Sequence, residues 1–99
     1  MIKHVVLFKL KKMASPEAKN SKLQELKTGF EGLKDKINVL RSIEVGVNCN
    51  PSEFFDLILI TVFDSMEHLA EYAGHPDHVA MVRKIGEVKD DRACVDFMC

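Results

Sequence analysis

The sequence predicts an α+β protein whose elements follow the order β-α-β-β-α-β. Three observations support this fold class. Residues 2–10 alternate between two faces with a period of two, as β-strands do, and residues 23–37 carry apolar side chains at helical spacing. Residues 54–63 form the most apolar segment and lie between a turn and a helix start. The chain has no repeat or linker-like tract, so one domain is expected over 1–99.

The first strand is expected at residues 2–10. One face is apolar apart from His4, and the other face mixes apolar side chains with lysines. The first face consists of Ile2, His4, Val6, Phe8 and Leu10. Because both faces carry apolar groups, both need to be covered.

A first helix is expected to begin at Ser15-Pro16-Glu17. Serine supplies an N-cap oxygen, proline tolerates the first helical position, and glutamate complements the positive helix end. An apolar stripe follows at 3-4-3-4 spacing, which predicts packing against a sheet. Its members are Leu23, Leu26, Phe30, Leu33 and Ile37.

Two further strands are expected at 39–47 and 54–63, joined by a turn at 48–52. A second helical segment is expected after the N-cap Ser65, with a break at Gly74-His75-Pro76. A final strand is expected at 93–98.

This order is that of ferredoxin-like proteins, in which helices cover one face of a four-stranded antiparallel sheet. The first and third strands carry apolar side chains on both faces. A second copy of the chain is the simplest cover for the bare face, so we expect a homodimer whose two sheets close into an α/β barrel.

The charge balance disfavours two classes of partner. Fourteen Lys and Arg residues stand against 15 Asp and Glu residues, for a net charge of −1. Neither nucleic acid nor an anionic membrane is therefore expected as a partner. No apolar run reaches the roughly 18 residues of a membrane span, and Lys3 interrupts the first apolar segment, so the expected location is cytoplasmic.

The three cysteines, Cys49, Cys94 and Cys99, have neither disulfide-framework nor zinc-site spacing. They are interpreted as small buried or terminal thiols, with Cys94 in the core. No metal and no cofactor is expected, because His75-x-x-His78 lacks a third spaced ligand and no phosphate-binding loop is present.

Tyr72, His75 and His78 follow at three-residue spacing around the helix break and are candidates to face a common region. A histidine in the first turn of a helix is biased toward its neutral form, which accepts a proton. Each candidate also has a structural interpretation. His75 is an N-cap or packing residue, His78 a partly exposed helix residue, and His4 a hydrogen-bonded core residue.

Several segments resemble the stress-responsive A/B barrel domain family over essentially the whole chain. They are the Lys3-His4 strand, residues 43–48 and 55–66, the Tyr-x-x-His-Pro-x-His run at 72–78, and residues 94–97. The resemblance implies a dimeric α+β barrel. It also implies possible catalysis, since a plant polyketide cyclase of this family uses a tyrosine and a histidine that match Tyr72 and His78, and His4 matches a pocket histidine. Leu57 stands where that cyclase has a further histidine.

Two functions follow as hypotheses. The first is binding of a small apolar or carbonyl-containing molecule between the helices and the sheet. The alternative is a lyase or cyclase that catalyses aldol-type chemistry, with His78 as base and Tyr72 as oxyanion donor. The residues expected around the ligand are His4, Phe8, Leu57, Tyr72, His75 and His78.

Overall fold

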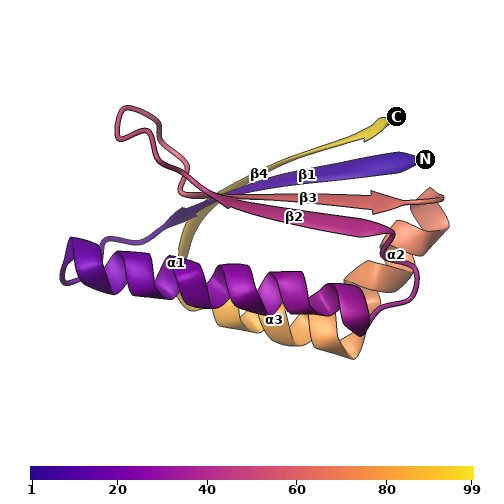
Figure 1. Cartoon of the computed structure of the whole chain (residues 1–99), viewed down its shortest axis with the longest axis horizontal. Coiled ribbons are helices and arrows are strands. Elements are labelled where there is room, and N and C mark those ends of the chain that lie inside the picture. Colours follow the sequence, from indigo (N-terminus) through magenta and orange to yellow (C-terminus); the bar gives the residue numbers. More distant parts are fainter.

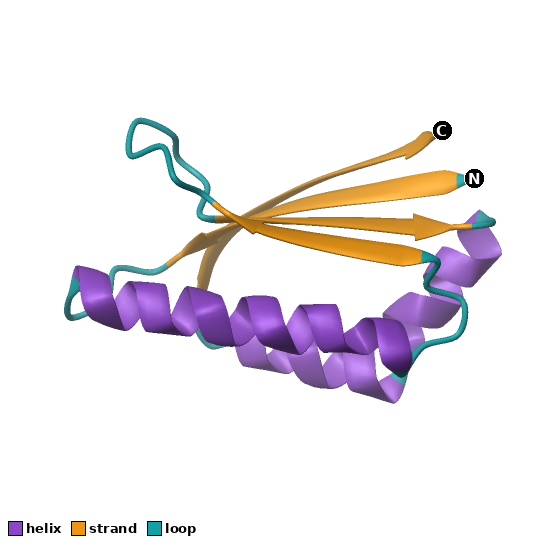
Figure 2. Cartoon of the chain, viewed as in Figure 1, coloured by secondary structure: helices purple, strands orange, loops and turns teal.

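Four antiparallel strands form one sheet in the computed structural model, which describes residues 1–99. The strands are β1 (Ile2–Leu10), β2 (Ser42–Val47), β3 (Leu57–Phe63) and β4 (Lys89–Met98), in the spatial order β2-β3-β1-β4. The helices are α1 (Pro16–Glu31), which continues into a 3₁₀ turn at Gly32–Asp35, α2 (Met66–Gly74) and α3 (Pro76–Gly86). All helices lie on one face of the sheet (Figures 1 and 2), which confirms the ferredoxin-like prediction. None of them is both long enough and apolar enough to cross a bilayer.

The helices begin where their capping residues predict. The Ser15 hydroxyl accepts a hydrogen bond from the Ala18 N–H at 3.1 Å, and the Ser65 hydroxyl accepts one from the His68 N–H at 3.2 Å. Between α2 and α3, His75 is extended, with φ −65° and ψ 135°. The following Pro76 disfavours a helical conformation at that position, so the chain stops and restarts as a second helix.

The hydrophobic core lies between the helices and the inner face of the sheet. Every member of the predicted apolar stripe of α1 and its continuation is buried. The inner faces of β1 and β3 contribute the other half of the core, chiefly Ile2, Val6, Phe8, Leu10, Leu57, Leu59, Thr61 and Phe63. The period of 3.6 in the helix and the period of two in the strands therefore both identified core residues correctly.

The second and third strands are shorter than predicted because the apolar pattern continues beyond the hydrogen-bonded ladder. β2 begins at Ser42 rather than residue 39, and β3 begins at Leu57 rather than residue 54. Leu40 is buried without belonging to a strand. Phe54 is 52% exposed, and the ammonium group of Lys9 lies 5.2 Å from its ring centroid.

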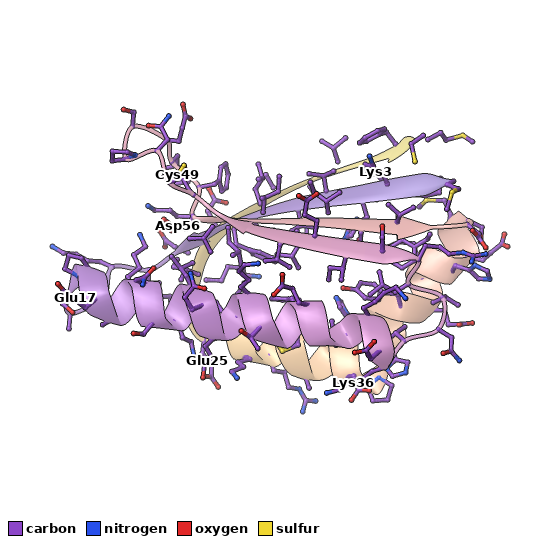
Figure 3. All side chains as sticks on the ribbon, in the orientation of Figure 1. Lys3, Glu17, Glu25, Lys36, Cys49 and Asp56 are labelled. Atoms are coloured by element: carbon purple, nitrogen blue, oxygen red, sulfur yellow. The ribbon has the colours of Figure 1, made fainter.

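Asp56 fixes the start of β3 and connects three elements. Its carboxylate accepts a hydrogen bond from the Leu10 N–H at 2.8 Å and pairs with Lys19 of α1 at 2.9 Å. Its own N–H donates to the Phe8 carbonyl at 2.8 Å. Burial raises the pKa of Asp56, but the Leu10 hydrogen bond and the ammonium groups of Lys19 and Lys9 outweigh it and lower the pKa overall. Figure 3 shows Asp56 where the loop that carries Cys49 joins the sheet.

The outer face of the sheet, opposite the helices, is uncovered and mainly apolar. The strand register places Val5 between Ile60 of β3 and Val95 of β4 on this face. Val95 is 63% exposed and Phe97 is 45% exposed. Lys3 also lies on this side (Figure 3). We refer to this surface as the outer apolar face; its apolar members are Val5, Leu7, Ile58, Ile60, Val62, Ala93, Val95 and Phe97.

The two ends of the chain lie together at one end of the sheet (Figure 1). The Cys99 N–H donates to the Met1 carbonyl at 3.0 Å, and the N-terminal ammonium group lies 3.5 Å from the Cys99 carbonyl oxygen. These contacts extend the ladder between β1 and β4 to the last residue of the chain.

The Asp56→Asn variant should lower the free energy of unfolding by about 1–3 kcal/mol at pH 7, because a buried hydrogen-bonded carboxylate loses its ion pairs. The folded-state pKa is lowered, so this stabilisation is complete above the unfolded pKa of about 3.9 and disappears as the pH falls through the folded value. Urea unfolding at pH 7 and pH 3 measures both effects.

The matched control is Asp64→Asn, which breaks an exposed pair with Arg41 at 2.7 Å. Exposed pairs contribute little, so this variant should lose less stability than Asp56→Asn at pH 7. Equal losses in the two variants would contradict the role given to Asp56.

Candidate functional site

A cavity of about 300 Å³ lies between the inner face of the sheet and helices α2 and α3. Eleven of the 16 residues that line it are hydrophobic, with Phe8 and Phe30 among them. The other five lining residues are His4, Thr61, His78, Lys89 and Arg92, and Tyr72, counted among the hydrophobic residues, adds a phenol hydroxyl. An apolar cavity with a few convergent polar groups is the usual form of a small-molecule site.

The break between α2 and α3 brings two of the predicted residues into contact. Tyr72 lies in the last turn of α2 and His78 in the first turn of α3. The centroids of their rings are 4.3 Å apart, with an angle of 46° between the ring planes. The bend at His75-Pro76 therefore joins the phenol and the imidazole at one wall of the cavity.

Tyr72 presents a protonated hydroxyl. The residue is 2% exposed, and its ring packs against Phe63 at a centroid distance of 5.0 Å. Burial raises the pKa of Tyr72 to about 12, so the phenol keeps its proton at neutral pH. The hydroxyl makes no hydrogen bond within the chain. It is not fully buried, because every fully buried polar side-chain atom has a partner, and Tyr72 is one of the residues that line the cavity.

His78 presents a lone pair. Its Nδ1 lies 3.0 Å from the Ala73 carbonyl oxygen. Because a carbonyl oxygen only accepts, Nδ1 carries the hydrogen and the neutral ring keeps its lone pair on Nε2. Burial lowers the pKa of His78 from 6.5, the Ala73 contact opposes this change, and the Coulombic effects of the nearby His4 and Arg92 side chains add to it. The imidazole is therefore neutral at pH 7.

His4 lines the cavity and is also held by hydrogen bonds, so both interpretations of this residue apply. Its Nδ1 is hydrogen-bonded to the Asp96 carboxylate, and the Cys94 Sγ lies 3.5 Å from the same nitrogen. The Thr61 hydroxyl donates to the His4 carbonyl at 3.4 Å. Asp96 was not identified from the sequence, because its partnership depends on the cross-strand register in which His4 faces Asp96.

Two expected ligand-binding residues lie outside the cavity. Leu57 is buried at the start of β3, where it pairs with Phe8 of β1 on one side and Val47 of β2 on the other. His75 caps α3 by accepting a hydrogen bond from the Asp77 N–H at 3.1 Å, which agrees with its structural interpretation. Phe8, in contrast, lines the cavity, and its ring stacks on Phe30 at 6.4 Å.

The carboxyl-terminal strand differs from its prediction in two respects. β4 begins at Lys89 rather than residue 93, which brings Lys89 and Arg92 to the cavity. Cys94 is exposed rather than in the core, because β4 is an edge strand bonded to β1 alone. Alternation missed the start of the strand because residues 89–92 are charged. It missed the exposure of Cys94 because alternation does not distinguish an edge strand from a central one.

Comparison with known proteins finds relatives that carry a stress-response A/B barrel domain. Stress-response A/B barrel domain-containing protein DABB1 of Arabidopsis thaliana is 30% identical over 102 residues, which cover 99% of this chain and 47% of DABB1. The chain thus spans about half the length of that relative. The related protein HS1 of the same plant is 33% identical over 81 residues, covering 79% of this chain and 71% of HS1.

A solved structure from Bacteroides fragilis, described as a dimeric protein of unknown function with a ferredoxin-like fold, is 43% identical with a TM-score of 0.90. The alignment covers 97% of this chain and 93% of that one. The family model of the stress-responsive A/B barrel domain matches residues 2–99. Sequence, fold and relatives agree, and the chain belongs to the stress-responsive A/B barrel domain family.

Proposed function

We propose that this chain binds a small, largely apolar molecule with a carbonyl group in the cavity between α2, α3 and the sheet. The contact between Tyr72 and His78 carries the proposal. It places a hydroxyl donor and a neutral imidazole at one apolar cavity. A carbonyl oxygen accepts from the hydroxyl, while the apolar lining accommodates the rest of the molecule.

Size and charge narrow the class of ligand. A volume of about 300 Å³ suits a compact molecule, such as a single substituted ring. Lys89 and Arg92 line the cavity, and no salt bridge of the chain uses either of them. Two cations without acidic partners favour a ligand that also carries an acidic group.

We also propose that two copies associate through the outer apolar face. A water-exposed apolar surface on both central strands costs free energy that a second sheet removes. The Bacteroides fragilis relative is described as dimeric, which supports this assembly. Sheet-to-sheet packing leaves the cavity free, because the cavity lies on the opposite face.

A second candidate function is proton transfer at a carbon next to a carbonyl, and the tautomer of His78 favours it. Nε2 of the neutral ring removes a proton from that carbon, while the Tyr72 hydroxyl donates a hydrogen bond to the developing enolate oxygen. The enolate carbon then adds to a second carbonyl, as in an aldol reaction. The imidazolium returns its proton to the resulting alkoxide.

Ligand binding can be tested with 4-hydroxyacetophenone, using 4-ethylphenol as a matched probe without a carbonyl. Nuclear magnetic resonance should show 4-hydroxyacetophenone shifting signals of residues that line the cavity, with weaker binding of 4-ethylphenol. Tyr72→Phe should weaken binding of the ketone by about 5- to 10-fold, the equivalent of one hydrogen bond, and leave 4-ethylphenol unaffected. Equal loss for both probes would contradict a hydrogen bond to the carbonyl.

Proton transfer can be tested by following deuterium exchange into the methyl group of 4-hydroxyacetophenone in D₂O. His78→Ala and Tyr72→Phe should each slow exchange on the order of 100-fold. The rate should fall as the pH drops through the lowered pKa of His78, because the protonated ring has no lone pair. His68→Gln, on α2 outside the cavity lining, is the control and should keep the full rate. Binding without exchange would exclude this second function for the probe and leave the binding function intact.

The association can be tested by light scattering at micromolar concentration, where the wild type should have twice the mass of one chain. Val95→Glu places a charge on the outer apolar face and should give monomers, since an unpaired charge in an apolar interface is unfavourable. Val82→Glu is the control for association, because Val82 is 45% exposed on α3 and lines the cavity on the helical side rather than the outer apolar face. A monomeric wild type, or dissociation in the control alone, would overturn the proposed interface.

A further inference from the structure

Three side chains of different chemistry meet on the inner face of the sheet, beside the cavity. The Nδ1 of His4, the Sγ of Cys94 and a carboxylate oxygen of Asp96 all lie within 4.8 Å of one another. His4 faces Asp96 across the β1–β4 ladder, and Cys94 precedes Asp96 by two residues on the same face. Two hydrogen-bonded strands, rather than a loop, therefore hold this His4–Cys94–Asp96 cluster together.

We propose that the His4–Cys94–Asp96 cluster binds one zinc ion through an imidazole nitrogen, a thiolate and a carboxylate oxygen. These are the ligand types that zinc takes in proteins. Bond lengths of about 2.3 Å to sulfur and 2.0–2.2 Å to nitrogen and oxygen place neighbouring ligands of a tetrahedral zinc about 3.5 Å apart. In this chain the Cys94 Sγ lies 3.5 Å from the His4 Nδ1 and 3.7 Å from the Asp96 oxygen.

The remaining pair of candidate ligands, His4 and Asp96, is joined by a proton. His4 and Asp96 share a hydrogen bond and lie closer than two ligands of one metal. Zinc takes the place of that proton and moves the two groups apart. The imidazole proton shifts from Nδ1 to Nε2, and the Cys94 thiol loses its proton to solvent. Two anionic ligands then balance the charge of the ion, with one proton released for each zinc bound.

The surroundings leave a fourth position open. His4 lines the cavity, and the Asp96 side chain is 33% exposed, so water or a bound molecule can reach the ion. Three protein ligands and one open position are typical of zinc sites that act on substrates. Arg92 is the nearby cation, and its side chain is exposed to solvent.

The other histidine pair does not offer a comparable site. The Nδ1 of His75 accepts from the Asp77 N–H, and the Nδ1 of His78 donates to the Ala73 carbonyl. Neither histidine belongs to a group of three or more candidate metal ligands, whereas His4, Cys94 and Asp96 do. The proposal is independent of the ligand proposed for the cavity.

Cobalt titration of the full-length chain tests the site, because tetrahedral Co²⁺ substitutes for Zn²⁺ and gives a thiolate-to-metal absorption band. One equivalent should produce this band together with visible bands of a tetrahedral ion, and Zn²⁺ should displace it. Cys94→Ser should abolish the thiolate band, and Asp96→Asn should weaken binding more than about 10-fold. Circular dichroism of both variants checks that they fold.

The matched control is the double variant Cys49→Ser/Cys99→Ser, which removes the other two thiols and should keep the full band. His78→Ala should keep it as well. The proposal is overturned if Co²⁺ and Zn²⁺ fail to bind at micromolar concentration, or if the band disappears in the double variant and persists in Cys94→Ser.

Discussion

The alternation of side chains along β1 is the constraint on which the rest of the structure depends. β1 lies between β3 and β4, so its inner residues meet both neighbours and the helices, and its outer residues form the centre of the outer apolar face. A shift of one residue would exchange the two faces and move His4 away from the cavity. Asp56 opposes such a shift, because its carboxylate and its backbone N–H bind Leu10 and Phe8 at the end of the strand.

The cavity has its chemical character because the fold buries polar groups next to apolar ones. The same loss of water keeps the proton on Tyr72 and keeps the His78 ring neutral. In a solvated tyrosine and histidine at the same spacing, burial would not stabilise this pairing of a protonated phenol with a neutral imidazole. The proline at position 76 is the local cause, since it bends the chain where α2 and α3 meet and turns both rings toward the sheet.

Sequence periodicity, together with the capping residues, was sufficient to predict the order of the elements, the helix starts and most of the core. It predicted which face a residue occupies but not how far along the sheet the residue lies. Leu57 shares the inner face with His4, yet the register places it opposite Phe8, about 13 Å along the strand from the His4–Thr61 pair. Asp96 was missed for the same reason, because its contact with His4 requires the pairing of two strands from opposite ends of the chain.

The adjacency of Met1 and Cys99 has a topological consequence. Because the ends lie on neighbouring strands, about 5 Å apart in the hydrogen-bonding direction, a short peptide can close the chain into a ring. New ends can then be opened in the loop between β2 and β3 without breaking any strand pairing of the sheet. The same geometry allows this fold to be inserted into a surface loop of a host protein, because the host backbone leaves and returns at nearly the same point.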